Sequence, residues 1–137
     1  MFERTFPRAL GSLEPMFAFV TEFASAQRLS PAATGDLTLI AEELFTNCVK
    51  YGGGPEGVAI GLDRQGAEVT LRLVDPGARP FDPTAAPAAD VAAPIEARRA
   101  GGLGIHLVRS IARELRYARE GGANVVTAVI GTEGAEG

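Results

Sequence analysis

The sequence has 137 residues, about the length of one domain, and its 46% hydrophobic content is sufficient for a packed core. A net charge of −4 and a pI near 5.0 argue against sequence-independent binding of nucleic acid, which needs clustered basic charge. The single cysteine, Cys48, excludes an intramolecular disulfide and a multi-cysteine metal site, and it suits a reducing cytoplasm. The sequence has no GK dipeptide and no apolar run of about 20 residues, so neither a P-loop nor a membrane span is expected.

Hydrophobic spacing predicts the elements of the first half of the chain. Residues 1–7 are compatible with a short edge strand. Apolar residues three and four apart predict one helix over Leu13–Leu29 and a second over residues 34–51, which a run of glycines ends. The period then changes to two, which predicts a hairpin with strands near 58–62 and 69–74.

The second half is expected to contain a long loop, a helix and a strand. Residues 76–100 hold five prolines and many alanines without periodicity, as expected of a functional lid. Gly101–Gly104 is predicted to open a third helix that reaches about Tyr117. A last strand over Asn124–Ile130 follows a Gly-Gly turn, and residues 132–137 are expected to form a frayed tail.

The order of these elements predicts the fold class. Strands and helices do not alternate strictly, which disfavours a doubly wound parallel sheet. We expect an α+β fold, a two-layer α/β sandwich in which helices cover one face of a mixed, mostly antiparallel sheet. Since we find no internal repeat and no linker, residues 1–137 are expected to form one domain.

The second predicted helix carries a first candidate functional pair, Glu43 and Asn47. Residues four apart on a helix face the same way, with Cβ atoms about 6 Å apart. A carboxylate and an amide carbonyl are hard oxygen donors that suit Mg²⁺. The alternative interpretation is a solvated helix edge with no ligand.

A second candidate motif is Asp75-Pro76-Gly77 at the end of an apolar strand. A carboxylate there can accept a hydrogen bond from an exocyclic amine such as that of adenine, and the glycine allows a ligand to approach the backbone. The motif is also compatible with an ordinary turn after a strand.

The third candidate motif is the glycine run Gly101–Gly104 before a helix. Backbone N–H groups at a helix N-terminus attract anions, so this segment can hold phosphate. It can equally be a flexible connector, and it does not have the spacing of a dinucleotide-binding fingerprint.

In this order, the three motifs resemble those of the GHKL ATPases, whose ATP-binding domain has the Bergerat fold. The segment DPGARPFDP and the segment GGLGIHLVR look most like those of the anti-sigma-factor serine kinases, and the resemblance covers roughly residues 5–131. The sequence departs from the wider superfamily at Arg79, which stands where a second glycine is common.

The resemblance implies a site for ATP and Mg²⁺. In it, Glu43 would be the general base, Asn47 would ligate Mg²⁺ and Asp75 would hold the adenine amine. Arg98 or Arg99 in the lid would reach the γ-phosphate. Further implied nucleotide contacts are Lys50, Tyr51, Gly77, Phe81, Gly102, Leu103, Gly104 and Thr127.

The resemblance also implies a function. It is that of an ATP-dependent serine/threonine kinase that sequesters a sigma factor and phosphorylates a STAS-type antagonist. Such a protein is expected to be cytoplasmic and homodimeric, with no direct role for nucleic acid or membrane. The alternatives are a nucleotide-dependent binding switch without kinase activity and a detached catalytic domain of the histidine-kinase type.

Three other features are assigned structural roles. Cys48 lies on the buried stripe of the second helix, and Phe17, Phe19 and Phe23 are interpreted as core or dimer contacts. His106, the single histidine, makes no metal site by itself, and its place early in the third helix leaves a role near phosphate open.

Overall fold

The computed structural model describes residues 2–52, 54–77 and 102–134, and it describes no side chains for residues 102–104. None of the described helices is both long and apolar enough to cross a membrane. The elements, in chain order, are β1 (Phe2–Phe6), the 3-10 turn η1 (Leu10–Ser12), α1 (Leu13–Ala26), α2 (Pro31–Tyr51), β2 (Val58–Gln65), β3 (Glu68–Pro76), α4 (Gly102–Ile111), β4 (Glu114–Glu120) and β5 (Ala123–Gly131).

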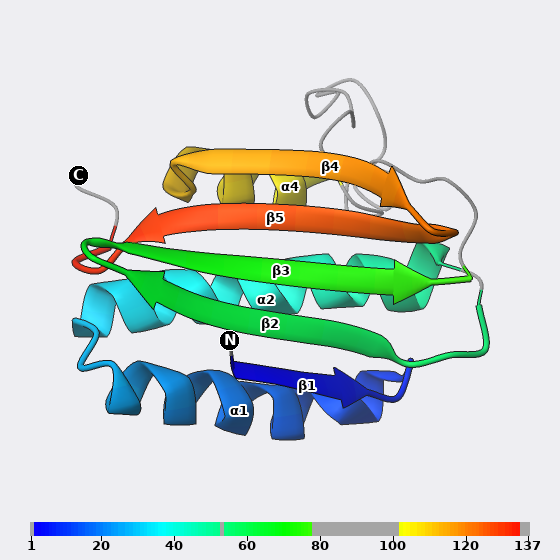
Figure 1. The fold of residues 1–137 in the computed structure, drawn as a ribbon, viewed down its shortest axis with the longest axis horizontal. Coiled ribbons are helices and arrows are strands. Elements are labelled where there is room, and N and C mark those ends of the chain that lie inside the picture. The colour runs from blue at the N-terminus through cyan, green and yellow to red at the C-terminus, as the bar shows by residue number, and fades with distance from the viewer. Residues whose placement is uncertain (1, 53, 78–101, 135–137) are drawn as a thin grey trace.

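Five strands form one sheet in the order β1-β2-β3-β5-β4, and the three described α-helices lie on one of its faces (Figure 1). The predicted α+β class and two-layer architecture are therefore confirmed. All four strand pairings are antiparallel, so the sheet is not mixed within the described residues. The predicted edge position of the first strand is confirmed, since β1 pairs only with β2.

Helix α2 lies across the middle of the helical layer and carries the centre of the core. It begins three residues before the predicted helix, because Ser30 is its N-cap, accepting a hydrogen bond from the Ala33 N–H at 3.0 Å, and Pro31 suits the first turn. Its inner face packs on β3 and β5. On α1, Phe19 and Phe23 are buried in the same core and Phe17 packs partly against it.

The third helix was predicted to extend too far toward its C-terminus. Helix α4 ends at Ile111, and Glu114–Glu120 is strand β4, which the sequence analysis missed. Leu115 continues the helical spacing of α4, but it also alternates with Tyr117, and both face the helical layer in the strand. Strand β5 decides between the two patterns: eight of its nine residues are buried, as expected of an interior strand that needs a partner on each side.

The turn between β4 and β5 explains how this pairing is specified. Gly121 and Gly122 have φ angles of +56° and +77°, the two positive values that a tight two-residue hairpin turn requires. The Gly-Gly pair therefore indicates a strand before it as well as after it. The sequence analysis predicted only the strand that follows.

Two predicted segments extend beyond the described residues. The proposed lid continues from β3 into residues 78–101, and residues 135–137 belong to the expected tail; both stretches lie outside the described residues. Thr132 is buried, and its N–H donates to the Ala67 carbonyl at 3.0 Å while its own carbonyl accepts from the Ser30 N–H. The chain is thus packed at least as far as Thr132.

Candidate functional site

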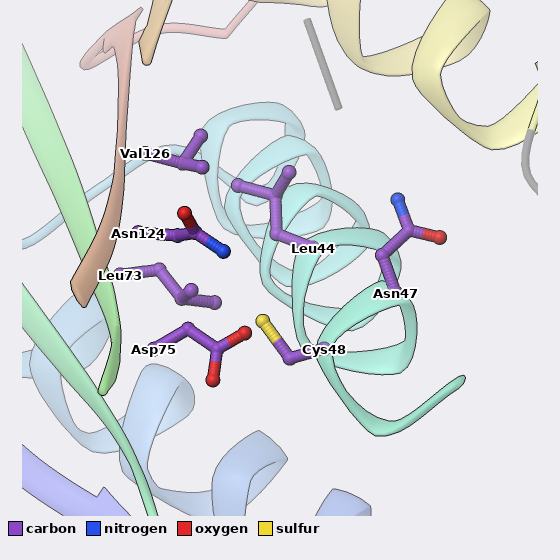
Figure 2. A pocket seen from close by; sticks show the side chains of 7 residues that line it. All are labelled: Leu44, Asn47, Cys48, Leu73, Asp75, Asn124 and Val126. Atoms are coloured by element: carbon purple, nitrogen blue, oxygen red, sulfur yellow. The ribbon is translucent and has the colours of Figure 1, made fainter. Parts of the chain in front are cut away.

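The second half of α2 presents the first group of candidate residues. Cys48 is turned toward Asp75 at the end of β3, while Asn47 leaves the helix on the side away from Asp75 (Figure 2). Both side chains are almost fully buried, with Asn47 7% exposed. Glu43, one turn earlier, is half-buried. The helix therefore gives this end of the molecule a thiol, an amide and a carboxylate on neighbouring faces.

The structure brings two of the predicted motifs together around one small cavity. Asn47 from the first motif and Asp75 from the second both line it, although 28 positions separate them in the chain. The remaining lining is mostly apolar. The full set of lining residues is Leu44, Asn47, Cys48, Leu73, Asp75, Asn124 and Val126 (Figure 2).

Asp75 is 3% exposed and forms an ion pair with Arg8, which the sequence analysis did not single out. The Arg8 guanidinium also donates to the Cys48 carbonyl at 3.1 Å and to the Pro76 carbonyl at 3.4 Å. It thereby joins the end of α2 to the end of β3. No local pattern marks Arg8, because its partners are 40 and 68 positions away.

The thiol of Cys48 is part of the same cluster. Burial, followed by the charge of Asp75 and a hydrogen bond to it, raises the pKa of Cys48 well above the usual range of a thiol. Cys48 therefore stays a neutral thiol that donates toward the carboxylate, rather than a nucleophile. Its predicted core position is compatible with this contact, since it is 8% exposed.

Asn124 is a second residue of the cavity that the sequence analysis missed. It stands directly opposite Asp75 in the antiparallel pairing of β3 with β5, and it is 3% exposed. Its Oδ1 accepts hydrogen bonds from the Tyr117 hydroxyl at 2.7 Å and from Arg119 Nη1 at 2.9 Å. The signal that could have found it is its alternation with Val126 and Ala128, the inward residues of the same strand.

Thr127, predicted as a nucleotide contact, is not among the residues that line this cavity. It pairs with Arg72, whereas Asp75 pairs with Asn124. Because successive residues of a strand point to opposite faces, Thr127, three positions after Asn124, lies on the open face of the sheet. There it borders a separate hollow with Arg72 and Arg116.

The surroundings of Glu43 raise the pKa of its carboxyl group, which makes the carboxylate a stronger proton acceptor. Partial burial and then the negative charge of Glu42 raise the pKa of Glu43 above 4.5, and the positive charge of Lys50 lowers it by a smaller amount. Lys50 is exposed in the last turn of α2, and Tyr51, the last residue of that helix, is half-buried.

The third motif occupies the start of a helix, as predicted. Gly102 is the first residue of α4, which contacts α2, and Leu103 and Gly104 follow in its first turn. His106 is exposed on the same helix, so it is not a core residue. Phe81, Arg98 and Arg99 lie outside the described residues.

Gly77 adopts a conformation that explains the glycine of the second motif. Its φ is +70°, and a Cβ at this position would lie 2.6 Å from Glu56 Oε2. Its N–H donates to the Gly122 carbonyl at 3.2 Å, so the end of β3 is tied to the β4–β5 turn. The chain therefore leaves β3 along a fixed path directly after Asp75.

Comparisons with known proteins agree with this arrangement. A family model described as the histidine kinase-like ATPase domain matches residues 6–130. Serine/threonine-protein kinase BtrW of Bordetella bronchiseptica is 31% identical over 112 residues, which cover 80% of this chain and 78% of that protein.

Two solved structures share the fold. The structure of the RsbU and RsbW domains of Rv1364c from Mycobacterium tuberculosis is similar with a TM-score of 0.68 over 93% of this chain and 30% of that chain. Histidine kinase AdeS of Acinetobacter baumannii is similar with a TM-score of 0.51 over 95% of this chain and 67% of that chain. Both are 14% identical to this chain, so they show the fold alone. From the family match over residues 6–130, the chain belongs to the histidine kinase-like ATPase domains.

Proposed function

We propose that this chain binds Mg·ATP with the adenine against Asp75 and transfers the γ-phosphoryl group to a serine or threonine of another protein. The observation that carries the proposal is the buried carboxylate. Asp75 Oδ1 lies beside Arg8 as an ion pair, yet it accepts no hydrogen bond from the residues that the structure describes. This carboxylate also lines the cavity, where it can accept a further hydrogen bond, and the exocyclic amine of adenine would donate it.

The remaining roles follow from the chemistry of the side chains around the cavity. Asn47 would give Mg²⁺ one oxygen ligand, and phosphate oxygens and water would complete the coordination. Lys50 would add positive charge toward the phosphates and Tyr51 would lie on the base. The other proposed nucleotide contacts are Gly77, Phe81, Arg99, Gly102, Leu103 and Gly104.

Glu43 is proposed as the general base of the transfer. The serine oxygen forms a bond to the γ-phosphorus as the bond from that phosphorus to the β–γ bridging oxygen breaks, and Glu43 receives the hydroxyl proton. The products are ADP and a phosphoserine. The raised pKa of Glu43 supports this role, because a carboxylate with a higher pKa is a stronger proton acceptor.

The protein substrate is proposed from the relatives. The curated relative is named a serine/threonine-protein kinase, and one structural neighbour contains an RsbW domain. We infer that the substrate is a STAS-type antagonist and that the chain, as a cytoplasmic homodimer, also holds a sigma factor inactive.

The test is incubation of the purified chain with γ-labelled ATP and candidate STAS-domain proteins. Transfer of label to a serine or threonine of one candidate, dependent on Mg²⁺, is the expected result. Label on a histidine would indicate chemistry of the histidine-kinase type. Tight ATP binding without transfer to any candidate would favour the nucleotide-dependent binding switch over the kinase.

A further inference from the structure

Arg8 belongs to none of the three sequence motifs, yet its guanidinium contacts the elements that carry two of them. It forms an ion pair with Asp75 in which the side chains are 10% and 5% exposed. It also donates to the carbonyls of Cys48, at 3.1 Å, and Pro76, at 3.4 Å. The guanidinium therefore lies against the strand end that holds the carboxylate and against the last turn of the helix that holds Asn47.

The segments on both sides of Arg8 fix the direction from which its side chain approaches. Phe6, two residues earlier, is 1% exposed, and its ring meets that of Phe45 on α2 edge-on with centroids 6.4 Å apart. After Arg8 the chain turns back, because the Pro7 carbonyl accepts from the Ser12 hydroxyl at 2.7 Å. The arginine is thus in place without a ligand, so a ligand that uses it does not have to order it.

Gly52, at the end of α2, is packed against the same ion pair. Its φ of −72° and ψ of 157° are extended backbone that any residue can adopt, so its conformation does not require glycine. Space does: a Cβ here would lie 2.6 Å from both Asp75 Oδ2 and the Cys48 carbonyl oxygen, and closer still to Arg8 Nη1. The ion pair and the helix end therefore leave no room for a side chain at this position.

The guanidinium determines what kind of acceptor Asp75 is. An ionised carboxyl group only accepts hydrogen bonds, whereas a protonated one also presents a donor, and a buried charge is costly unless a counter-charge accompanies it. The Cys48 thiol donates to this carboxylate too, but a neutral thiol supplies no counter-charge. With Arg8 beside it, the carboxylate offers a donor that enters the cavity a charged acceptor in a fixed orientation.

We propose that Arg8 is a positioning residue of the nucleotide site and acts through Asp75, by keeping the carboxylate ionised and oriented toward the amine of the base. The proposal rests on the proposed function, since it assigns a partner to the carboxylate that would hold adenine. Because the same guanidinium binds the Cys48 carbonyl, Arg8 also fixes this carboxylate relative to α2, whose Asn47 and Lys50 would contact the metal and the phosphates.

The test compares Mg·ATP with the triphosphate of purine riboside, which lacks only the exocyclic amine, by titration calorimetry. The wild type should prefer ATP about ten- to a hundredfold, the value of a hydrogen bond to a charged group. Arg8→Met should reduce this preference to less than about threefold, and Arg8→Lys, which keeps the cation, should recover part of it. Arg72→Met, which removes an arginine of an exposed pair, is the matched control and should keep the preference.

A merely structural arginine would give a different result. Its loss would weaken both nucleotides equally, so a folded Arg8→Met variant with the wild-type preference would overturn the proposal. A wild type that binds the two nucleotides equally, or binds neither, would instead overturn the assignment of adenine to Asp75.

A comparison without the carboxylate covers the case in which Arg8→Met does not fold. Asp75→Asn combined with Arg8→Met buries no unpaired charge, and it is compared with Asp75→Asn alone. If Arg8 acts through Asp75, the two variants should bind ATP with affinities within about twofold of each other. A further loss of affinity on removing Arg8 from the Asp75→Asn variant would overturn the proposal, because it would show an effect that does not pass through the carboxylate.

Discussion

The two faces of the β3–β5 pair place similar polar side chains in opposite surroundings. On the face covered by helices, Asp75 and Asn124 are each 3% exposed. The ion pair between Arg8 and Asp75 is also largely buried, with side chains 10% and 5% exposed. On the open face, Arg72 pairs with Glu120 at 3.4 Å with side chains 39% and 58% exposed. A buried charge must be paired or bound, whereas an exposed pair is worth little. Among the described residues, the buried charged and amide side chains of this strand pair thus lie on the covered face, where a bound ligand could satisfy them.

The largest effect is expected on α2, where two adjacent glutamates can be compared. Glu43→Gln should lower phosphorylation of the protein substrate by about a hundred- to ten-thousand-fold, the usual contribution of a general base. ATP affinity should change little, because the base contacts the incoming hydroxyl. Glu42→Gln is the matched control and should keep most of the activity. Phosphorylation rates and calorimetric affinities for both variants make this comparison.

The pH dependence of Glu43 sharpens the same prediction. Since the base must be ionised, the rate should fall with falling pH through its pKa, and this limb should begin above the usual 4.5 of a glutamate. The stability effect has the opposite direction. A carboxyl with a raised folded-state pKa contributes stability below 4.5 that is lost as pH rises through the raised value, and Glu43→Gln should abolish this loss. An identical pH profile in the Gln variant would exclude Glu43 as the titrating group.

The next largest effect is expected on the free energy of unfolding, where Arg8 can be compared with Arg72. Arg8→Met leaves the Asp75 carboxylate buried without its cation and should lower the free energy of unfolding by about 3–5 kcal/mol. Arg72→Met breaks an exposed pair and should cost less than about 1 kcal/mol. Urea denaturation with unchanged slopes measures both. Combining Arg8→Met with Asp75→Leu should recover much of the stability; equal costs for the two single variants would contradict the comparison.

Local patterns in the sequence were sufficient for much of the fold. Helical spacing along α2, with Ser30-Pro31 before it, and the alternation of Val58–Leu62 and Val69–Leu73 depend on residues close together in the chain. Strand β4 was missed because Leu115 fits both periods, and only its pairing with the buried β5 decides between them. The choice is made by tertiary structure rather than by local preference.

The candidate site divides in the same way. Asp75 was found because it stands at the end of an apolar strand, and Asn47 because it lies four residues after Glu43 on a predicted helix. Arg8 was missed because its partners lie 40 or more positions away, and Asn124 because its importance depends on the register that sets it opposite Asp75. Thr127 was expected to contact the nucleotide from the family resemblance alone, and the face to which it points depends on the register of β5 with β3.

The smallest expected effect tests the two faces of a single strand. Thr127→Val, on the open face of β5, should leave ATP affinity within about twofold of the wild type, since its side chain lies on the other side of the sheet from Asp75. Asn124→Ala, three positions away on the covered face, should weaken it measurably. Calorimetry on both variants reads the difference, and a loss at Thr127 that matched the loss at Asn124 would place the nucleotide elsewhere.

Titration of Mg·ATP into the wild-type chain and into Asp75→Asn tests the central claim most directly. We expect the wild type to bind, and Asp75→Asn to bind about ten- to a hundredfold more weakly, because the amide replaces a charge-assisted hydrogen bond with a neutral one. Thermal unfolding of the variant should be recorded alongside, since Arg8 then loses its ionised partner. Affinity for ATP that is the same in a folded Asp75→Asn variant as in the wild type would contradict the assignment of this cavity to adenine.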